Sequence, residues 1–172
     1  MHQRVPSGFT FAGVAAGLKK TGARDVALIV SDRPCTGAAV FTTNRFPAAP
    51  VLYDRELIAE NPARLRAVVI NSGCANACTG PEGLADAALM AHAAEEALGA
   101  PPRSAAVMST GVIGPRLPMD RLRDGIRQAA EVLAPDSWED AATAIMTTDT
   151  RPKTAFRYLD GCALFANRRY CP

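Results

Sequence analysis

Short apolar runs, each bounded by polar residues, recur along the first 110 residues of the chain. Residues 26–30 read Val-Ala-Leu-Ile-Val between two Asp-containing flanks, and residues 66–71 and 105–109 are apolar runs of similar length. Runs of this length that are bounded by turn residues predict buried β-strands. Residues 38–43 follow a turn-rich stretch, so they are predicted to pair with residues 26–30 as a hairpin.

Helical periodicity lies between and after these runs. Residues 82–98 place apolar side chains three and four positions apart, and Gly99 follows as a stop signal. The many alanines of this segment predict close packing on a sheet. Two further helices are predicted, one from Pro118 to the proline at 135 and one from about 136 to about 146.

The order of these segments indicates the fold class. Strands alternate with helices, but without the strict rhythm of a doubly wound fold. The sequence therefore predicts one α/β (α+β) domain, a mixed β-sheet with packed helices, over residues 1–156. Residues 157–172 are predicted to form a divergent tail.

Composition and charge exclude several functions. A net charge of +2 and an aromatic content of 6% predict no nucleic-acid partner. No apolar stretch approaches the roughly 20 residues of a membrane helix, and the N-terminus lacks the apolar core of a signal peptide. We therefore expect no membrane partner and a cytoplasmic location.

The cysteines and histidines predict neither a metal site nor a disulfide framework. Cys74 and Cys78 are four positions apart, but no further pair completes a zinc site, and His2 and His92 lie far away in sequence. Neither thiol has a nearby histidine to serve as a base, which argues against a cysteine nucleophile. We interpret the thiols as structural or free and expect no cofactor. The cysteines are Cys35, Cys74, Cys78, Cys162 and Cys171.

Three polar strings rich in Gly, Ser, Asn or Thr follow predicted elements, at residues 71–80, 109–114 and 146–150. Such residues dominate ordinary turns, which is the simpler interpretation of each string. Three strings together favour a polar pocket at one end of the sheet. Residues 109–114, Ser-Thr-Gly-Val-Ile-Gly, are also suited to present backbone N–H groups to an oxyanion. Nucleotide-binding glycine patterns, a nucleophile elbow and a catalytic triad are all absent.

The chain resembles the amino-terminal part of the ornithine acetyltransferase family, the bifunctional glutamate N-acetyltransferases of arginine biosynthesis. The resemblance is collinear and covers roughly residues 8–156. The matching blocks are residues 8–9 with 12–14, 31–32, 40–44, 48–51, 71–73 with 75–80, 109–114 with 117–120, and 144–150 with 152–153.

The resemblance implies a mechanism of acetyl transfer from N-acetylornithine to glutamate, in a heterotetramer of α and β chains. The precursor cuts itself before an internal threonine, which becomes the N-terminal nucleophile of a β chain, with its own amine as base. The oxyanion hole of the family matches Thr110 and Gly111, and its substrate-binding threonine matches Thr147. The expected ligands are N-acetylornithine, ornithine and glutamate, with acetyl-CoA left open as a donor.

Two features depart from the family pattern. The family continues with a strand, a Lys-Gly-x-Gly-Met-Ile segment and an Ala-Thr cleavage point, and residues 156–172 resemble none of these. No threonine follows Thr154, so we expect the nucleophile on a β-chain-like partner rather than in this chain. Cys74 stands where the family usually has Asn, and a thiol cannot replace the paired donor and acceptor of an amide.

Three interpretations of the tail stay open: a truncated or frame-disrupted product, an α-like subunit with a separate β-like partner, and a stand-alone binding protein. They correspond to two classes of function. The first is the α-chain part of an acetyltransferase, inactive by itself. The second is a non-catalytic remnant or a module that binds a small molecule or a protein.

Overall fold

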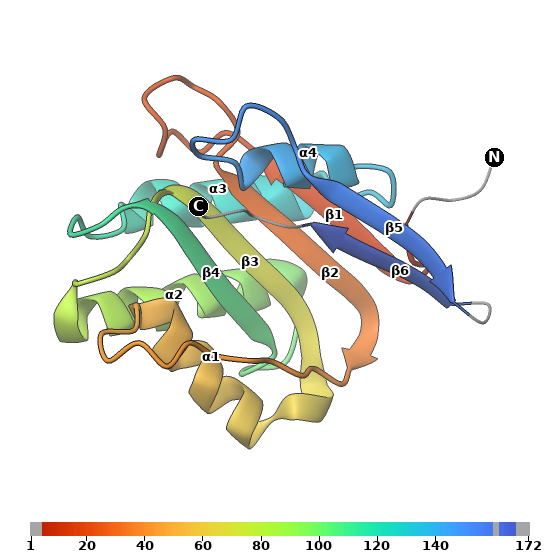
Figure 1. Cartoon of the computed structure of the whole chain (residues 1–172), viewed down its shortest axis with the longest axis horizontal. Coiled ribbons are helices and arrows are strands. Elements are labelled where there is room, and N and C mark those ends of the chain that lie inside the picture. Colours follow the sequence, from red (N-terminus) through yellow and green to blue (C-terminus); the bar gives the residue numbers. More distant parts are fainter. Residues whose placement is uncertain (1–4, 160–161, 168–172) are drawn as a thin grey trace.

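The computed structural model describes residues 5–159 and 162–167. A four-stranded mixed sheet in the order β1-β2-β3-β4 forms its centre (Figure 1). β1 pairs with β2 and β2 with β3 in antiparallel register, whereas β3 and β4 run parallel. The strands are β1 Phe9–Val14, β2 Val26–Cys35, β3 Leu65–Cys74 and β4 Ala105–Val112.

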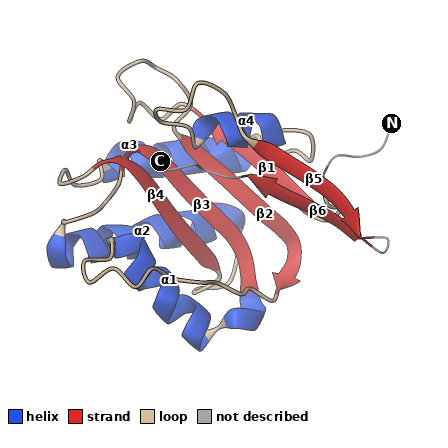
Figure 2. Ribbon diagram, viewed as in Figure 1, coloured by secondary structure: helices blue, strands red, loops and turns tan. Residues whose placement is uncertain are grey.

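Helices cover both faces of this sheet (Figure 2). The main core joins α1, α2 and α3 to one face, and a second, smaller cluster joins α4 to the other. α2 belongs to the crossover that a parallel β3–β4 pair requires. The helices are α1 Ala49–Glu60, the 3₁₀ helix η1 Pro62–Arg64, α2 Gly80–Leu98, α3 Met119–Glu131 and α4 Trp138–Ala144.

Strand alternation explains why two cores form. In β2, Val26 and Leu28 face the main core, while the intervening Ala27 faces the α4 cluster. α4 lies very close to β1, because a Cβ on Gly13 would be 2.1 Å from the carbonyl oxygen of Asp140. Glycine at this position therefore allows the second layer to form.

The predicted fold class is confirmed: the structure is a mixed sheet with packed helices. The apolar runs at 26–30, 66–71 and 105–109 lie in β2, β3 and β4, and the helix predicted at 82–98 is α2. The helices predicted from 118 and 136 are α3 and α4, each shorter than its pattern indicates.

The hairpin predicted between 26–30 and 38–43 is wrong. β2 already has β1 on one side and β3 on the other, so neither of its edges is free for a third partner. Residues 38–43 form a loop, and the Val40 side chain is fully exposed. The chain turns away at Gly37, whose N–H donates to the Pro62 carbonyl oxygen at 2.7 Å.

Several elements were not expected from the sequence. Two of them, β1 and α1, lie in segments that gave no clear periodicity. β5 Thr154–Leu159 and β6 Cys162–Asn167 form an antiparallel hairpin. The expectation that no strand follows the Thr-Thr-Asp block is therefore wrong, and the predicted boundary at 156 falls inside β5.

Among the residues described, no helix is long and apolar enough to cross a membrane.

Candidate functional site

Two of the three polar strings lie side by side at one end of the sheet. β3 and β4 run parallel, so both strands end at the same edge. Their register pairs Asn71 with Ser109, Ser72 with Thr110, and Gly73 with Gly111. The predicted oxyanion residues thus lie directly beside the end of β3.

Gly111 brings the two strand ends unusually close. Its φ is +135°, which L side chains rarely adopt, and the facing Gly73 has a φ of +106°. A Cβ on Gly111 would lie 2.3 Å from the carbonyl carbon of Gly73 and 2.6 Å from the amide nitrogen of Cys74. Only glycine fits here, so the local sequence fixes the path of the backbone next to Thr110.

Backbone hydrogen bonds hold the loop after Gly111 against the loop after β3. The Ala75 N–H donates to the Val112 carbonyl at 2.9 Å, and the Gly114 N–H donates to the Ala77 carbonyl at 3.0 Å. The buried Cys74 thiol donates to the Pro115 carbonyl oxygen at 3.2 Å. The departure from the family pattern at position 74 is thus a thiol that contacts the loop after the predicted oxyanion residues.

An ion pair fixes the far end of the same loop. The Arg116 guanidinium donates to both carboxylate oxygens of Asp86, at 2.7 and 3.0 Å, and the Asp86 side chain is only 2% exposed. The hydrogen bonds to the Asp86 carboxylate raise the pKa of Arg116. A buried carboxylate with a bidentate partner thus ties the loop that follows β4 to α2.

The third polar string reaches the same end of the sheet through Ser72. The Ser72 hydroxyl donates to the carbonyl oxygen of Ala144, the last residue of α4, at 2.5 Å. Thr147 follows three positions later and is half-buried. The structure therefore brings the segment of Thr147 to β3, the strand that pairs with Thr110. Thr110 is 8% exposed.

Two polar atoms at this end of the sheet are buried without a hydrogen-bond partner in the described part of the chain. They are Oδ1 of Asn71 and Oγ of Ser109, whose residues face each other across β3 and β4. The Asn71 amide nitrogen donates to the Cys74 carbonyl at 2.8 Å. The polarity of both strings was visible in the sequence, but the facing of these two side chains depends on strand register.

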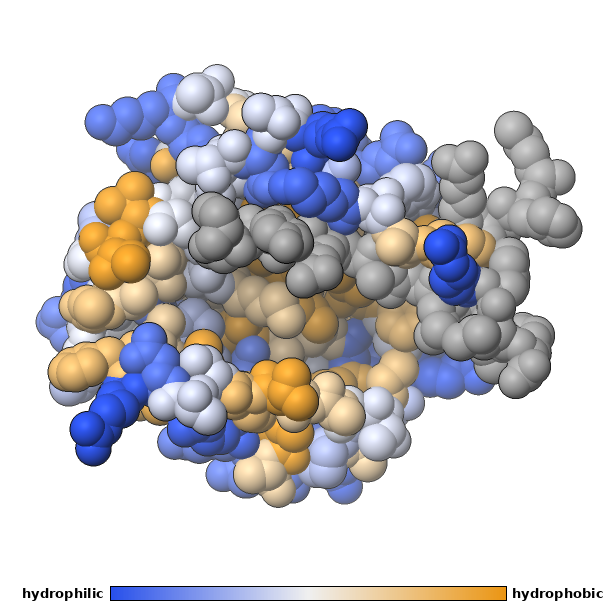
Figure 3. Space-filling model, in the orientation of Figure 1, coloured by the Kyte–Doolittle hydropathy of each residue, from blue (hydrophilic) through white to orange (hydrophobic). Residues whose placement is uncertain are grey.

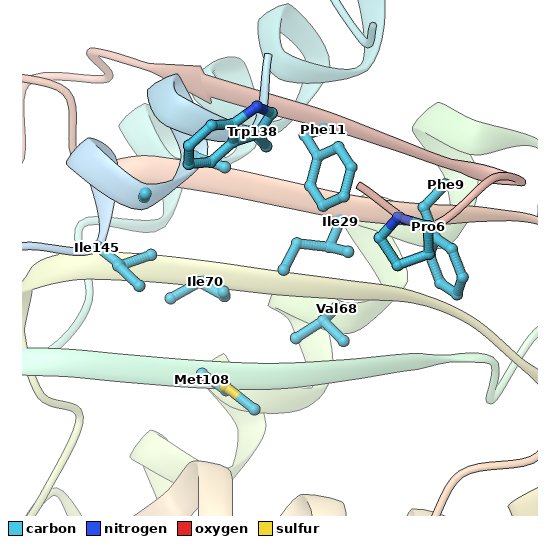
Figure 4. Close-up of a pocket in the computed structure, with 11 residues that line it drawn as sticks. Pro6, Phe9, Phe11, Ile29, Val68, Ile70, Met108, Trp138 and Ile145 are labelled. Atoms are coloured by element: carbon cyan, nitrogen blue, oxygen red, sulfur yellow. The ribbon is translucent and has the colours of Figure 1, made fainter. Parts of the chain in front are cut away.

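An apolar cavity of about 330 Å³ lies on the α4 face of the sheet (Figure 4). Side chains from the first three strands and from α4 line it, and Met108 of β4 lies at its lower margin in this view. The same face is hollowed in the space-filling view (Figure 3). Met108 is 50% exposed although the sequence predicts a buried strand there. Its neighbours in the cavity wall include Ile29, Val68, Ile70, Trp138 and Ile145.

Asp54 connects α1 to β4, the edge strand that carries the predicted oxyanion residues. Its Oδ1 accepts the Val107 N–H at 2.9 Å. Burial raises the pKa of Asp54 from 3.8 to about 6, and the hydrogen bond from Val107 opposes this shift. Within residues 5–159 and 162–167, no cluster of three or more His, Cys, Asp or Glu could hold a metal ion.

A match to a known protein family covers most of the chain. Residues 10–165 match the ArgJ family, and the chain therefore belongs to the ArgJ family. The match includes both strands of the β5–β6 hairpin up to residue 165.

Curated relatives are similar over most of this chain. The chain is 54% identical over 157 residues to the arginine biosynthesis bifunctional protein ArgJ of Symbiobacterium thermophilum. This match covers 90% of this chain and 39% of the relative. It is 48% identical to the mitochondrial ArgJ protein of Neurospora crassa, covering 88% of this chain and 33% of the relative. The chain therefore spans little more than a third of the curated relatives that it matches.

Two solved structures share the fold. Ornithine acetyltransferase from Mycobacterium tuberculosis, crystallised in complex with ornithine, is 41% identical with a TM-score of 0.92. The match covers 98% of this chain and 91% of that chain. The ArgJ protein of Bacillus halodurans is 38% identical with a TM-score of 0.82, covering 94% of this chain and 85% of that chain.

We predict that Gly111→Ala destabilises the protein by about 3 kcal/mol or more, because the new Cβ meets backbone atoms and the positive φ is strained. Urea denaturation measures the change. Gly22→Ala is the matched control, since Gly22 also has a positive φ, +71°, but open space around it. The control should lose only about 1 kcal/mol, and equal losses in the two variants would contradict the close approach of β3 and β4.

We predict that Asp54 makes stability depend on pH in a defined direction. Because its pKa is higher in the folded protein than in the unfolded chain, its proton stabilises the fold below about pH 4. This contribution is lost as the pH rises from about 4 to 6, and the ionised group costs roughly 1 to 2 kcal/mol at pH 7 after allowance for solvent screening. Asp54→Asn should therefore gain stability relative to wild type between pH 4 and 7.

Urea denaturation at pH 4, 5, 6 and 7 measures this difference. Asp124→Asn is the control, because Asp124 is exposed on α3 and faces Arg127 at 3.2 Å. A constant gap between Asp54→Asn and wild type across the four pH values would refute the raised pKa.

Proposed function

We propose that the chain is the α-chain-like portion of a glutamate N-acetyltransferase, which moves an acetyl group from N-acetylornithine to glutamate in arginine biosynthesis. The observation that carries the proposal is the likeness to ornithine acetyltransferase complexed with ornithine, at 41% identity and a TM-score of 0.92. The chain covers 91% of that crystallised chain but only 39% of the Symbiobacterium relative. These proportions support the assignment of the matched stretch to the α portion.

Acetyl transfer proceeds in two halves in this proposal. The hydroxyl of an N-terminal threonine on a β-chain-like partner attacks the acetyl carbonyl of N-acetylornithine, and its amine takes up the hydroxyl proton. The C–N bond breaks, the proton passes to the departing amine, and ornithine leaves. The amine of glutamate then attacks the acetyl ester, gives up a proton and releases the threonine hydroxyl.

The present chain contributes binding and charge stabilisation to both halves. Thr110 and Gly111 form the oxyanion hole, where donors aimed at the developing negative charge lower the barrier. The close approach at Gly73 and Gly111 and the ion pair of Arg116 support a rigid loop for this task. Thr147 binds the substrate, since its hydroxyl both donates and accepts hydrogen bonds.

The β-chain-like partner covers the apolar cavity on the α4 face in this proposal. Half of the Met108 side chain is exposed beside the apolar wall, and Val112 and Ile113 next to the oxyanion residues are 61% and 65% exposed. Exposed apolar side chains grouped in this way are typical of protein interfaces. A partner here would also bring its nucleophile to Thr110.

The same proposal covers assembly and location. Two such α and two β chains form a heterotetramer, and the protein acts in the cytoplasm. The Neurospora crassa relative, in contrast, is named as a mitochondrial protein.

The proposal is tested by adding a β-like chain. We predict acetyl transfer from N-acetylornithine to glutamate when the chain is mixed with the part of the Symbiobacterium relative beyond the matched stretch, made with a free N-terminal threonine. Thr110→Ala should lower kcat about 100-fold, the typical effect of losing an oxyanion donor. Thr43→Ala, at an exposed loop position, should leave kcat within twofold. No transfer above background in the wild-type mixture would sink the proposal.

Met108→Glu tests the docking face. A carboxylate buried against the cavity should weaken association with the β-like chain at least tenfold, because an unpaired buried charge is costly. Sedimentation or co-purification measures the affinity. Val132→Glu is the control, since Val132 is 55% exposed at the end of α3 and away from this face. Equal affinities of the two variants would place the partner elsewhere.

A further inference from the structure

One backbone carbonyl joins three separate parts of the chain. The Ala144 carbonyl oxygen accepts the Ser72 hydroxyl at 2.5 Å and the Lys19 ammonium at 3.2 Å. Ala144 and Ser72 are both completely buried. A lysine at the last carbonyls of a helix is a favourable C-terminal cap. The donors come from the loop between β1 and β2 and from β3.

The same donors are tied to each other through Asp25, so that the contacts form a closed ring. The Lys19 N–H donates to Oδ2 of Asp25 at 2.9 Å, and the Ser72 N–H donates to the Asp25 carbonyl at 2.8 Å. The buried Asp25 carboxylate also accepts the N–H groups of Ala16 and Leu18, at 2.7 and 2.6 Å. A network in which the Asp25, Ser72 and Ala144 members are buried and hydrogen-bonded rigidifies the segments that it joins.

The ring lies between the two predicted substrate-contacting parts of the site. Ser72 pairs in strand register with Thr110. Ala144 lies three positions before Thr147. The Met146 N–H donates to the carbonyl oxygen of Thr143, the residue before Ala144, at 3.2 Å. A displacement of Ala144 would therefore move Thr147 and change its position relative to Thr110.

We propose that Lys19 and Ser72 are positioning residues that hold the Thr147 segment in place relative to the strand of Thr110. The assignment rests on the proposed acetyl transfer for its effect on the reaction. Neither residue contacts substrate in this proposal. Each acts through the Ala144 carbonyl, and each would be invisible to a comparison of catalytic groups alone.

Hydrogen exchange of the full chain gives the first test. In Lys19→Met and Ser72→Ala, the amides of residues 145–149 should exchange about five- to tenfold faster, the size expected for losing one net hydrogen bond. Lys19→Arg retains a cationic donor and should restore slow exchange. Lys20→Met is the first control, because Lys20 is the exposed neighbour.

Ser104→Ala is the control for the serine. The Ser104 hydroxyl also donates to a backbone carbonyl at 2.5 Å, that of Pro101, and Ser104 is equally buried at the other end of the sheet. It should lose similar overall stability without faster exchange at 145–149. Unchanged exchange in Lys19→Met and Ser72→Ala, or an equal increase in Ser104→Ala, overturns the positioning role.

Steady-state kinetics with the β-like chain give the second test. Lys19→Met and Ser72→Ala should raise KM for N-acetylornithine at least fivefold, with Lys19→Arg near wild type and both controls within twofold. Wild-type kinetics in both variants would overturn the proposal. If the wild-type mixture transfers no acetyl group, the proposed function fails, and the exchange measurement alone decides whether the two residues hold the segment.

Discussion

The parallel pairing of β3 with β4 is the constraint on which the rest of the structure depends. Parallel neighbours end at the same edge, so two polar strings that are far apart in the sequence arrive side by side. The pairing also demands a long crossover between the two strands. α2 supplies this crossover on the main-core face of the sheet. That helix in turn carries Asp86, whose buried carboxylate holds the loop after β4 through Arg116. Sheet topology, core and loop geometry thus follow from one strand pair.

Much of the fold was predictable because its central strands are rich in β-branched and apolar residues. The runs in β2, β3 and β4 and the alanine-rich α2 were found from periodicity. The same rule failed at residues 38–43. These apolar and β-branched residues occupy a loop because β2 has no free edge. The β5–β6 hairpin was not predicted. Strand pairing is a long-range property that local pattern does not contain.

The candidate site divides in the same way. Thr110, Gly111 and Thr147 came from ordered sequence blocks, and their roles in catalysis stay predictions. Lys19 gave no signal, and Ser72 was visible only as a member of the polar string 71–80. Their shared partner lies 125 and 72 positions away along the chain. A spacing rule finds residues that act within one loop. It cannot find residues whose meeting point is created by a helix docking on the opposite face of the sheet.

The closed ring through Asp25 has a consequence for the order of folding. Its members come from a loop after β1, from β3 and from the end of α4, so it closes only after the sheet has formed and α4 has docked. Contacts of such large sequence separation form slowly, because chain entropy must be lost first. We therefore expect the polar end of the sheet to be among the last parts of the molecule to form. A chain interrupted before α4 would keep the glycine-rich strand ends but leave the Ser72 hydroxyl without its acceptor.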